Sequence, residues 1–253
     1  QDDEPVTKVH EAELRERGPG PEADLNRLLA LPVIDPHAAP DLTDRFRRKG
    51  GTMRLRPIQS AALHQIERGG GLLAPVAVGL GKSLVAFLTP VVLKATRPLL
   101  LIPAALREQC QNDLIRYGQH FHVPKDLLIR SYEELSNPRR SGMLRILAPN
   151  LIIADEAHKL RHFSSTRVRR MRRYFKENPD CKFIALSGTM TSRSLKDYAH
   201  LAKWALGQGS PLPLDHGLLE AWTAALEEGP TAPLAPICQK HGEPNPRSAF
   251  RRH

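Results

Sequence analysis

The sequence is poor in cysteine, in aromatic residues and in long apolar runs. Its three cysteines, Cys110, Cys181 and Cys238, lie far apart. An odd number without framework spacing indicates reduced thiols and a cytoplasmic protein, or a nuclear one. The longest apolar runs, such as residues 99–102, are far too short to span a bilayer, so no membrane partner is expected. The acidic first residues lack both the apolar core of a signal peptide and an initiator methionine, and we expect a processed or trimmed chain.

Positive charge is in excess, and it is unevenly distributed. The formal net charge is +10 over 253 residues. Residues 1–24 hold eight acidic and three basic residues, whereas the remainder carries 34 basic and 19 acidic ones. A basic body with an acidic tail favours a polyanionic partner, most simply nucleic acid. Charge alone does not establish this partner, because many basic proteins have no such role.

From Leu55 onward, short apolar runs alternate with longer amphipathic stretches. This pattern is typical of parallel strands joined by crossover helices, and it predicts an α/β fold with a parallel sheet between helices. The predicted strands are 72–74, 99–102, 127–131, 151–154 and 183–186, and the predicted helices are 57–68, 83–95, 104–117, 167–176 and 195–206. Pro90 is expected to kink or shorten the second of these helices.

The composition changes on both sides of this region and predicts three segments. Residues 1–50 mix acidic residues, proline and glycine with one short apolar stretch, 25–34, and we expect an N-terminal extension that contains one helix. Residues 51–207 form the α/β lobe. Residues 208–253 carry one predicted helix, 216–227, and many prolines. We expect a Pro-rich linker or insertion there, rather than a second complete domain.

A glycine-rich loop, residues 79–83, follows the first predicted strand and begins the second predicted helix, which is the context of a phosphate loop. Gly79 and Gly81 let backbone amides approach phosphate oxygens closely. Lys82 can then reach the β and γ phosphates of ATP, and the Ser83 hydroxyl can bind Mg²⁺. The strict pattern has glycine where this chain has Val76. The alternative is a glycine-rich turn whose lysine is only a surface charge.

Two adjacent carboxylates, Asp155 and Glu156, follow the apolar strand 151–154. Asp155 is expected to hold Mg²⁺, through water, and Glu156 to orient or deprotonate an attacking water molecule. His158 is expected to link this site to neighbouring loops. Acidic residues are also favoured at a helix N-terminus, but that explains one acid and not its conjunction with a phosphate loop. Because both motifs follow strands, we expect them at the edge of the sheet where α/β proteins bind ligands.

Four more stretches stand in order with these motifs: Leu55-Arg56-Pro57-Ile58-Gln59, Leu100-Leu101-Ile102-Pro103, Ile129-Arg130-Ser131-Tyr132-Glu133-Glu134-Leu135 and Ala185-Leu186-Ser187-Gly188-Thr189. Together with the phosphate loop and Asp155-Glu156-Ala157-His158, they resemble superfamily 2 helicases over about residues 54–206, and most of all the Swi/Snf-type DNA translocases. The resemblance implies a RecA-like lobe of the P-loop NTPase class that uses ATP and Mg²⁺. It implies that Gln59 contacts the adenine, and that His158, Ser187, Gly188 and Thr189 couple the ATP state to movement on nucleic acid.

The same resemblance implies a partner, since such enzymes bind ATP between two RecA-like lobes and the second lobe contributes arginines. Nothing after Gly207 resembles that lobe, so we expect it in cis or from a partner, and we expect the 253-residue chain alone to hydrolyse ATP very slowly. DNA is the favoured nucleic acid. The alternatives are an RNA helicase lobe of the same superfamily and a non-catalytic module that binds nucleotide or nucleic acid.

The segment from Lys159 to Arg173 carries seven basic residues and no acidic ones. Its densest part, on one predicted helix, consists of Arg169, Arg170, Arg172 and Arg173. Such a run is either a solvated helix face or a contact for phosphates or a partner. Few aromatic residues are interleaved with it, which favours contact with a nucleic-acid backbone over base stacking.

Overall fold

The computed structural model describes residues 20–32, 39–76, 79–188, 194–227 and 232–253. The chain divides into two compact units. The sheet unit comprises Asp35–Thr191 and Trp204–Leu206, and the helical unit comprises Gln1–Ile34, Ser192–Lys203 and Gly207–His253. One helix, α10 (Lys196–Leu206), contributes residues to both units.

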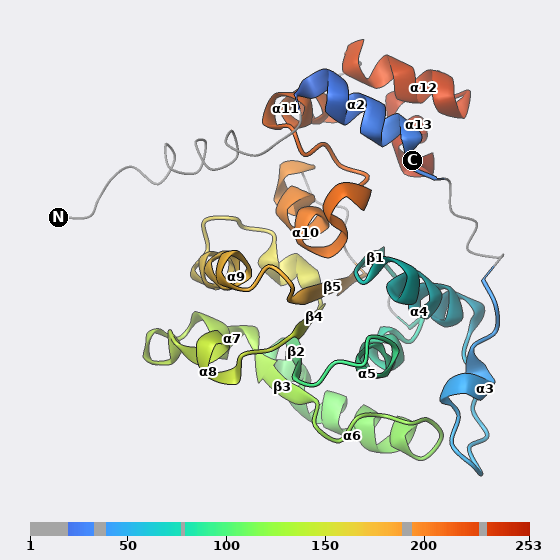
Figure 1. Ribbon diagram of the computed structural model, residues 1–253, viewed down its shortest axis with the longest axis vertical. Helices are drawn as coiled ribbons and strands as arrows, with labels where there is room; N and C mark the ends of the chain where they lie inside the picture. Colours follow the sequence, from blue (N-terminus) through green and yellow to red (C-terminus); the bar gives the residue numbers. More distant parts are fainter. Residues whose placement is uncertain (1–19, 33–38, 77–78, 189–193, 228–231) are drawn as a thin grey trace. The chain divides into compact units, whose positions relative to one another are not determined.

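Five parallel strands form the centre of the sheet unit (Figure 1). Their order is β1-β5-β4-β2-β3. The strands are β1 (Leu72–Pro75), β2 (Pro98–Ile102), β3 (Leu128–Ser131), β4 (Leu151–Asp155) and β5 (Lys182–Ser187). All of β2 is buried, as are the first four residues of β4, which is why these strands read as unbroken apolar runs. The predicted α/β fold and its five strands are confirmed, with ends that differ by one residue at most.

Helices cover both faces of the sheet (Figure 1). One face carries α4 (Pro57–Gly69), α5 (Lys82–Val92) and α6 (Arg107–Gly118). The other carries α9 (Thr166–Glu177) with two short helices, α7 (Tyr132–Ser136) and α8 (Met143–Leu147). The remaining elements of this unit are α3 (Thr43–Phe46) and the 3₁₀ turns η2 (Ala104–Leu106), η3 (Pro138–Arg140) and η4 (Ala157–Leu160). The fold is the RecA-like arrangement that the sequence predicts.

Two predicted helices differ from the observed ones at their ends. The helix expected over 83–95 includes Pro90 and ends at Val92, because Lys94, just past the C-cap, has a φ of 50°, in the left-handed region that terminates helices. The helix expected over 104–117 begins with the 3₁₀ turn η2, and α6 itself starts at Arg107. The short α7 was not expected. It starts at a capping box in which the Ser131 hydroxyl accepts from the Glu134 amide and the Glu134 carboxylate accepts from the Ser131 amide.

The helical unit packs four further helices around an apolar core. They are α2 (Pro21–Ala30), α11 (His216–Glu227), α12 (Ala235–His241) and α13 (Pro246–Arg252), with the 3₁₀ turns η5 (Gly207–Gly209) and η6 (Ala232–Leu234). Leu28, Trp222, Leu234, Ile237 and Ala249 are fully buried in this core. The predicted helix 216–227 is confirmed at both ends. Among the described residues of the expected linker or insertion, α12 and α13 are two further helices. The predicted boundaries at residues 50 and 207 stay predictions.

A buried ion pair joins α2 to the segment 208–215 inside the helical unit. Asp24 is fully buried, and its Oδ1 lies 2.7 Å from Arg27 Nε. Its other oxygen accepts hydrogen bonds from the backbone amides of Leu214 and Asp215, at 2.6 and 2.8 Å. The Arg27 guanidinium also donates to three backbone carbonyls, those of Gln208, Ser210 and Leu212. The pair therefore supplies hydrogen-bond partners to five backbone groups of the segment 208–215.

Among the described residues, no helix combines the length and the apolar composition that crossing a membrane requires.

Candidate nucleotide site

The phosphate loop lies between β1 and α5, and two glycines give it its shape. Gly79 and Gly81 have φ angles of +85° and +79°, in the left-handed region that side chains rarely adopt. A Cβ atom at Gly81 would lie 2.2 Å from the Gln59 Nε2 atom. The backbone conformation therefore requires glycine at position 81, and a side chain there would also displace the end of the Gln59 side chain. The loop ends at the N-terminus of α5, where free amides and the helix dipole favour an anion.

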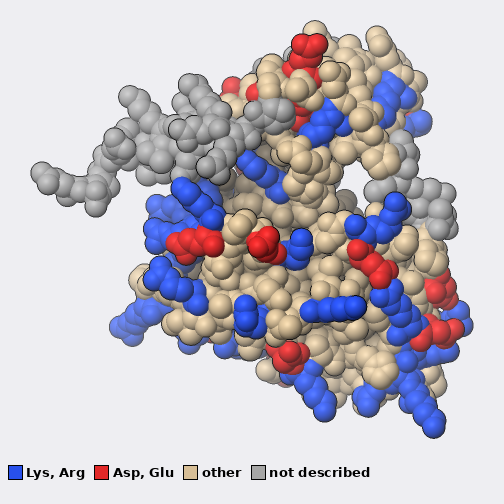
Figure 2. All heavy atoms as spheres, viewed as in Figure 1, with Lys and Arg blue, Asp and Glu red and all other residues tan. Residues whose placement is uncertain are grey.

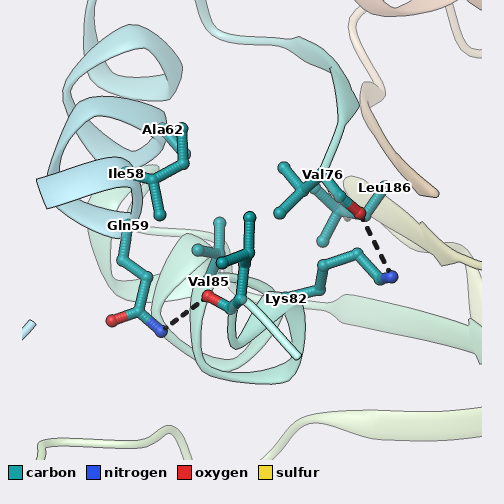
Figure 3. A pocket seen from close by; sticks show the side chains of 8 residues that line it. Ile58, Gln59, Ala62, Val76, Lys82, Val85 and Leu186 are labelled. Carbon is teal, nitrogen blue, oxygen red and sulfur yellow. Dashed lines mark hydrogen bonds between the residues drawn. The ribbon is translucent and has the colours of Figure 1, made fainter. Parts of the chain in front are cut away.

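Lys82, the first residue of α5, is buried with 9% of its surface exposed. Its Nζ donates to the Val76 carbonyl at 3.3 Å (Figure 3). The same atom lies 3.4 Å from Glu156 Oε1. Because the Lys82 ammonium is buried, the alternative in which this lysine is only a surface charge does not hold. It is placed where a phosphate group at the loop would meet it, beside the predicted catalytic carboxylate.

The acidic pair lies at the end of β4, as predicted. Asp155 closes the strand, and Glu156 follows with φ 54° and ψ 50°, a left-handed conformation that is uncommon outside glycine. Burial, and to a smaller extent the neighbouring Glu156, raise the pKa of Asp155 to about 6, although Lys82 acts in the opposite direction. A cation bound at this carboxylate would act in the same direction as Lys82 and favour its ionised form.

His158 and Ser187 connect the ends of β4 and β5. The His158 Nδ1 atom lies 3.2 Å from Glu156 Oε2 and 3.2 Å from the Ser187 hydroxyl. Burial lowers the pKa of His158. The structure thus brings together the predicted linking histidine, the predicted catalytic carboxylate and the first residue of the predicted coupling motif. Gly188 follows directly, and Thr189 lies outside the described residues.

Gln59 lies on α4 and faces the phosphate loop (Figure 3). Its Oε1 accepts from the Arg56 amide at 2.8 Å, and its Nε2 donates to the Gly81 carbonyl at 3.0 Å. Beside it is a small hollow lined mainly by apolar side chains, among them Ile58, Ala62 and Val85. The amide therefore fixes the position of the loop in this structure. Its predicted contact with adenine stays a prediction.

Two residues of this site were named within motifs but given no role from sequence. The Arg56 guanidinium donates to the Gly79 carbonyl at 2.6 Å and so helps to hold the loop in place. The Tyr132 hydroxyl donates to the Asp155 carbonyl at 2.7 Å, and its buried ring fixes the turn that carries the acidic pair. Only the capping-box spacing of Ser131 and Glu134 signalled a local structure here, and it gave no hint of the contact with Asp155.

The donor groups of the site suit Mg²⁺ bound together with a nucleotide. Magnesium in such sites is held by one or two protein oxygens and completes its octahedron with phosphate oxygens and water. Ser83, the second residue of α5, and Asp155, the last residue of β4, supply a hydroxyl and a carboxylate. No cluster of three or more His, Cys, Asp or Glu side chains suited to an isolated metal ion occurs among the described residues.

The arginines of α9 do not form one uniform face. Arg169 and Arg173 are exposed. The Arg170 guanidinium instead donates to the carbonyls of Leu135 and Asn137, at 2.7 and 2.8 Å, and Arg172 lies over the Phe163 ring at 4.8 Å. Lys and Arg side chains gather on the left of Figure 2, where Figure 1 places α9. The predicted nucleic-acid contact now depends on Arg169 and Arg173, because the other two are engaged by the protein.

Comparison with known sequences agrees with this geometry. A sequence model of the DEAD/DEAH box helicase family matches residues 56–198, more than half of the chain. The chain belongs to the DEAD/DEAH box helicase family. The matched region of this helicase-family domain begins at Arg56, three residues before Gln59. It includes the phosphate loop, the acidic pair and the end of β5. No curated protein sequence matches the chain.

Among solved structures, this helicase-family domain is similar to one described as the Sulfolobus solfataricus SWI2/SNF2 ATPase core in complex with dsDNA. The TM-score is 0.50 and the sequence identity is 17%. The similarity covers 83% of this chain and 45% of that chain, so the protein spans less than half the length of that relative. At this identity the likeness establishes the fold, and the RecA-like lobe of superfamily 2 helicases is that fold.

Proposed function

We propose that this chain is the ATP-binding lobe of a nucleic-acid-dependent ATPase that acts on DNA. One observation carries the proposal: Lys82 at the phosphate loop lies 3.4 Å from Glu156 at the end of the neighbouring acidic strand. A cation for the phosphates, a carboxylate for the water and a carboxylate for the metal are thereby within reach of one γ-phosphoryl group. That constellation is not needed for binding nucleotide alone, which favours an ATPase over a non-catalytic module.

Each residue has a distinct task in the proposed reaction. Gly79 and Gly81 shape the loop around the phosphates, and Lys82 neutralises charge on the β and γ groups. Mg²⁺, held by Ser83 and Asp155, supplies further charge neutralisation when it is bound. Glu156 orients the attacking water and accepts its proton, and the contact with His158 sets the position of Glu156. Ser187 connects this network to β5, so that a change at the γ-phosphate can reach the coupling motif.

The isolated 253-residue chain is expected to hydrolyse ATP very slowly, even with saturating DNA. The residues that the structure describes hold one parallel sheet, and an arginine finger from a second lobe is worth about 10³ to 10⁵ in rate. Adding a second RecA-like lobe, in cis or as a separate protein, should restore turnover that DNA stimulates. The rate of hydrolysis is measured as steady-state phosphate release by the purified chain, with and without DNA.

The variant Glu156→Gln is the control for this experiment, since it keeps the size of the side chain and removes its basicity. It should abolish the restored turnover while ATP binding remains. Fast DNA-stimulated hydrolysis by the chain alone would contradict the prediction, and would mean that an arginine of this chain or of a second copy completes the site.

The proposed DNA contact of α9 makes a second prediction. Binding to DNA should be independent of sequence and should weaken with salt, because phosphate contacts release counterions. Reversing Arg169 and Arg173 together to glutamate should weaken binding and reduce the slope of log affinity against log salt by about two, one for each lost phosphate contact. Fluorescence anisotropy of a labelled duplex over a salt series measures both quantities.

The matched control is the double variant Lys49→Glu with Arg68→Glu, which replaces two exposed basic residues outside α9. It changes the net charge by the same amount as the α9 variant. It should change the affinity less and leave the slope nearly as it was. Equal effects of the two pairs would mean that α9 acts only through net charge. A stronger preference for single-stranded RNA than for DNA would favour the alternative, an RNA helicase lobe.

A further inference from the structure

A groove lies in the sheet unit beyond the end of α5 that is opposite the phosphate loop. Its volume is about 510 Å³, within the range of binding pockets of proteins. Its walls come from the end of α5, the end of α6, the residue Arg48 after α3, and the segment 121–125 that follows α6. Val91, on the groove, is nine residues along α5 from Lys82, which corresponds to about 14 Å of helix. An occupant of the groove would therefore not contact the phosphate loop.

The floor of the groove is apolar, and one of its residues is unusually exposed. Phe121 is fully buried beneath it, and Leu114 and Val123 pack against the core while keeping part of their surface open. Val91 is 37% exposed, although the residues of α5 from Leu84 to Pro90 and Val92 are all buried. Val91 is thus exposed between buried neighbours and lies beside the partly exposed Leu114 and Val123. Together these three side chains form an apolar surface large enough to bury one apolar side chain of a partner.

The rim of the groove is basic. Arg48, His122 and Lys125 are exposed, and the residues that line the groove, all of them described, include no acidic side chain. The Arg48 guanidinium donates to the Gly118 carbonyl at 2.7 Å, which holds its charge at the rim. Because the bond uses one N–H group, other donors of the guanidinium stay available for a carboxylate.

We propose that this groove binds an acidic protein segment that carries an apolar anchor residue. The anchor packs on Val91, Leu114 and Val123, and carboxylates beside it meet Arg48 and Lys125. Nucleic acid fits less well, since its backbone has no apolar side chain to bury on this floor. Its bases need an open aromatic ring for stacking, and Phe121 is fully buried. The occupant is therefore a protein partner, and its binding is independent of the proposed ATPase reaction.

The test uses the full chain and a phage-displayed library of random dodecapeptides. After selection on the protein, one enriched peptide is labelled and its affinity is measured by fluorescence anisotropy. The enriched peptides should share an apolar anchor flanked by Asp or Glu. Val91→Asp should weaken binding about tenfold or more, because it removes an apolar contact and adds a repelling charge. Lys125→Glu should slow association and flatten its salt dependence, as expected of a rim charge.

Ile115 and Lys176 provide matched controls. Ile115 is 67% exposed on α6 but does not line the groove, and Lys176 is an exposed base on α9. Ile115→Asp and Lys176→Glu should leave peptide binding within about twofold, as expected of surface changes away from the contact. The proposal is overturned if no peptide is enriched, if enriched peptides are basic or lack an anchor, or if Ile115→Asp weakens binding as much as Val91→Asp. It is also overturned if a poly(dT) oligonucleotide binds and Val91→Asp abolishes that binding.

Discussion

We expect Lys82→Ala to abolish the binding of Mg-ATP by this chain. The Lys82 ammonium is buried over the phosphate loop, 3.4 Å from Glu156 Oε1, and it is the cation that the β and γ phosphates would meet. Removing one partner of a buried charge pair costs about 2 to 5 kcal/mol. Since 1.4 kcal/mol is tenfold in affinity, the loss should be at least about thirtyfold and up to several thousandfold, which puts binding beyond the range of the titration. Isothermal titration calorimetry of both proteins measures it.

Two controls separate this effect from a loss of structure. Lys82 also donates to the Val76 carbonyl, so the thermal unfolding of the variant must be compared with that of the unchanged protein. Ser83→Ala leaves the lysine in place and should weaken only the Mg²⁺-dependent part of nucleotide binding. Equal affinity of the unchanged protein and a folded Lys82→Ala variant would contradict the assignment of the phosphate loop.

The second large effect is expected in the helical unit, from Asp24→Ala. This substitution leaves the Arg27 guanidinium without its carboxylate and removes the acceptor of two backbone amides, those of Leu214 and Asp215. Breaking a buried ion pair by removing one partner destabilises proteins by about 3 to 5 kcal/mol. Most of this cost comes from the charge and the amides that stay behind without partners. We therefore expect a large shift of the denaturant midpoint of this unit toward lower concentration.

The two tryptophans of the chain allow this unit to be followed alone. Trp222 lies in the core of the helical unit and Trp204 belongs to the sheet unit, so Trp204→Phe leaves a fluorescence signal from the helical unit. In that background Asp24→Ala is compared with Glu22→Ala, an exposed acid in the first turn of the same helix. The control should cost less than about 1 kcal/mol. Similar shifts for both variants would mean that the buried pair contributes no more than a surface charge.

The strands and the positions of the candidate site residues at strand ends were predictable, because both depend on short, local patterns. Buried parallel strands are continuous apolar runs, so β2 and β4 could be located to within a residue. The glycines of the loop, Lys82 and the acidic pair stand directly after such strands. Since parallel strands end at one edge of the sheet, adjacency in sequence to a strand end was sufficient to predict that they meet.

The short helices and the helical unit were not predictable in the same way. Helices of five to seven residues, such as α7, α8, α12 and α13, are too short to display a hydrophobic period. Their stability comes from tertiary packing rather than from propensity. The role of α2 depends on Asp24 and Arg27, which read as ordinary surface charges until their partners near residue 212 are known.

The sequence by itself determined the α/β class, the strands, and the position of the phosphate loop and the acidic pair at the ends of strands, because these follow from local patterns and from chain direction. The tertiary structure decided which side chains actually meet. It placed Arg56 on the loop, Tyr132 on the turn of Asp155, and Arg170 on carbonyls at the C-terminal end of α7. These contacts join residues more than 20 positions apart, and no periodicity specifies them. They follow from how helices pack on the two faces of a sheet, which the chain as a whole determines.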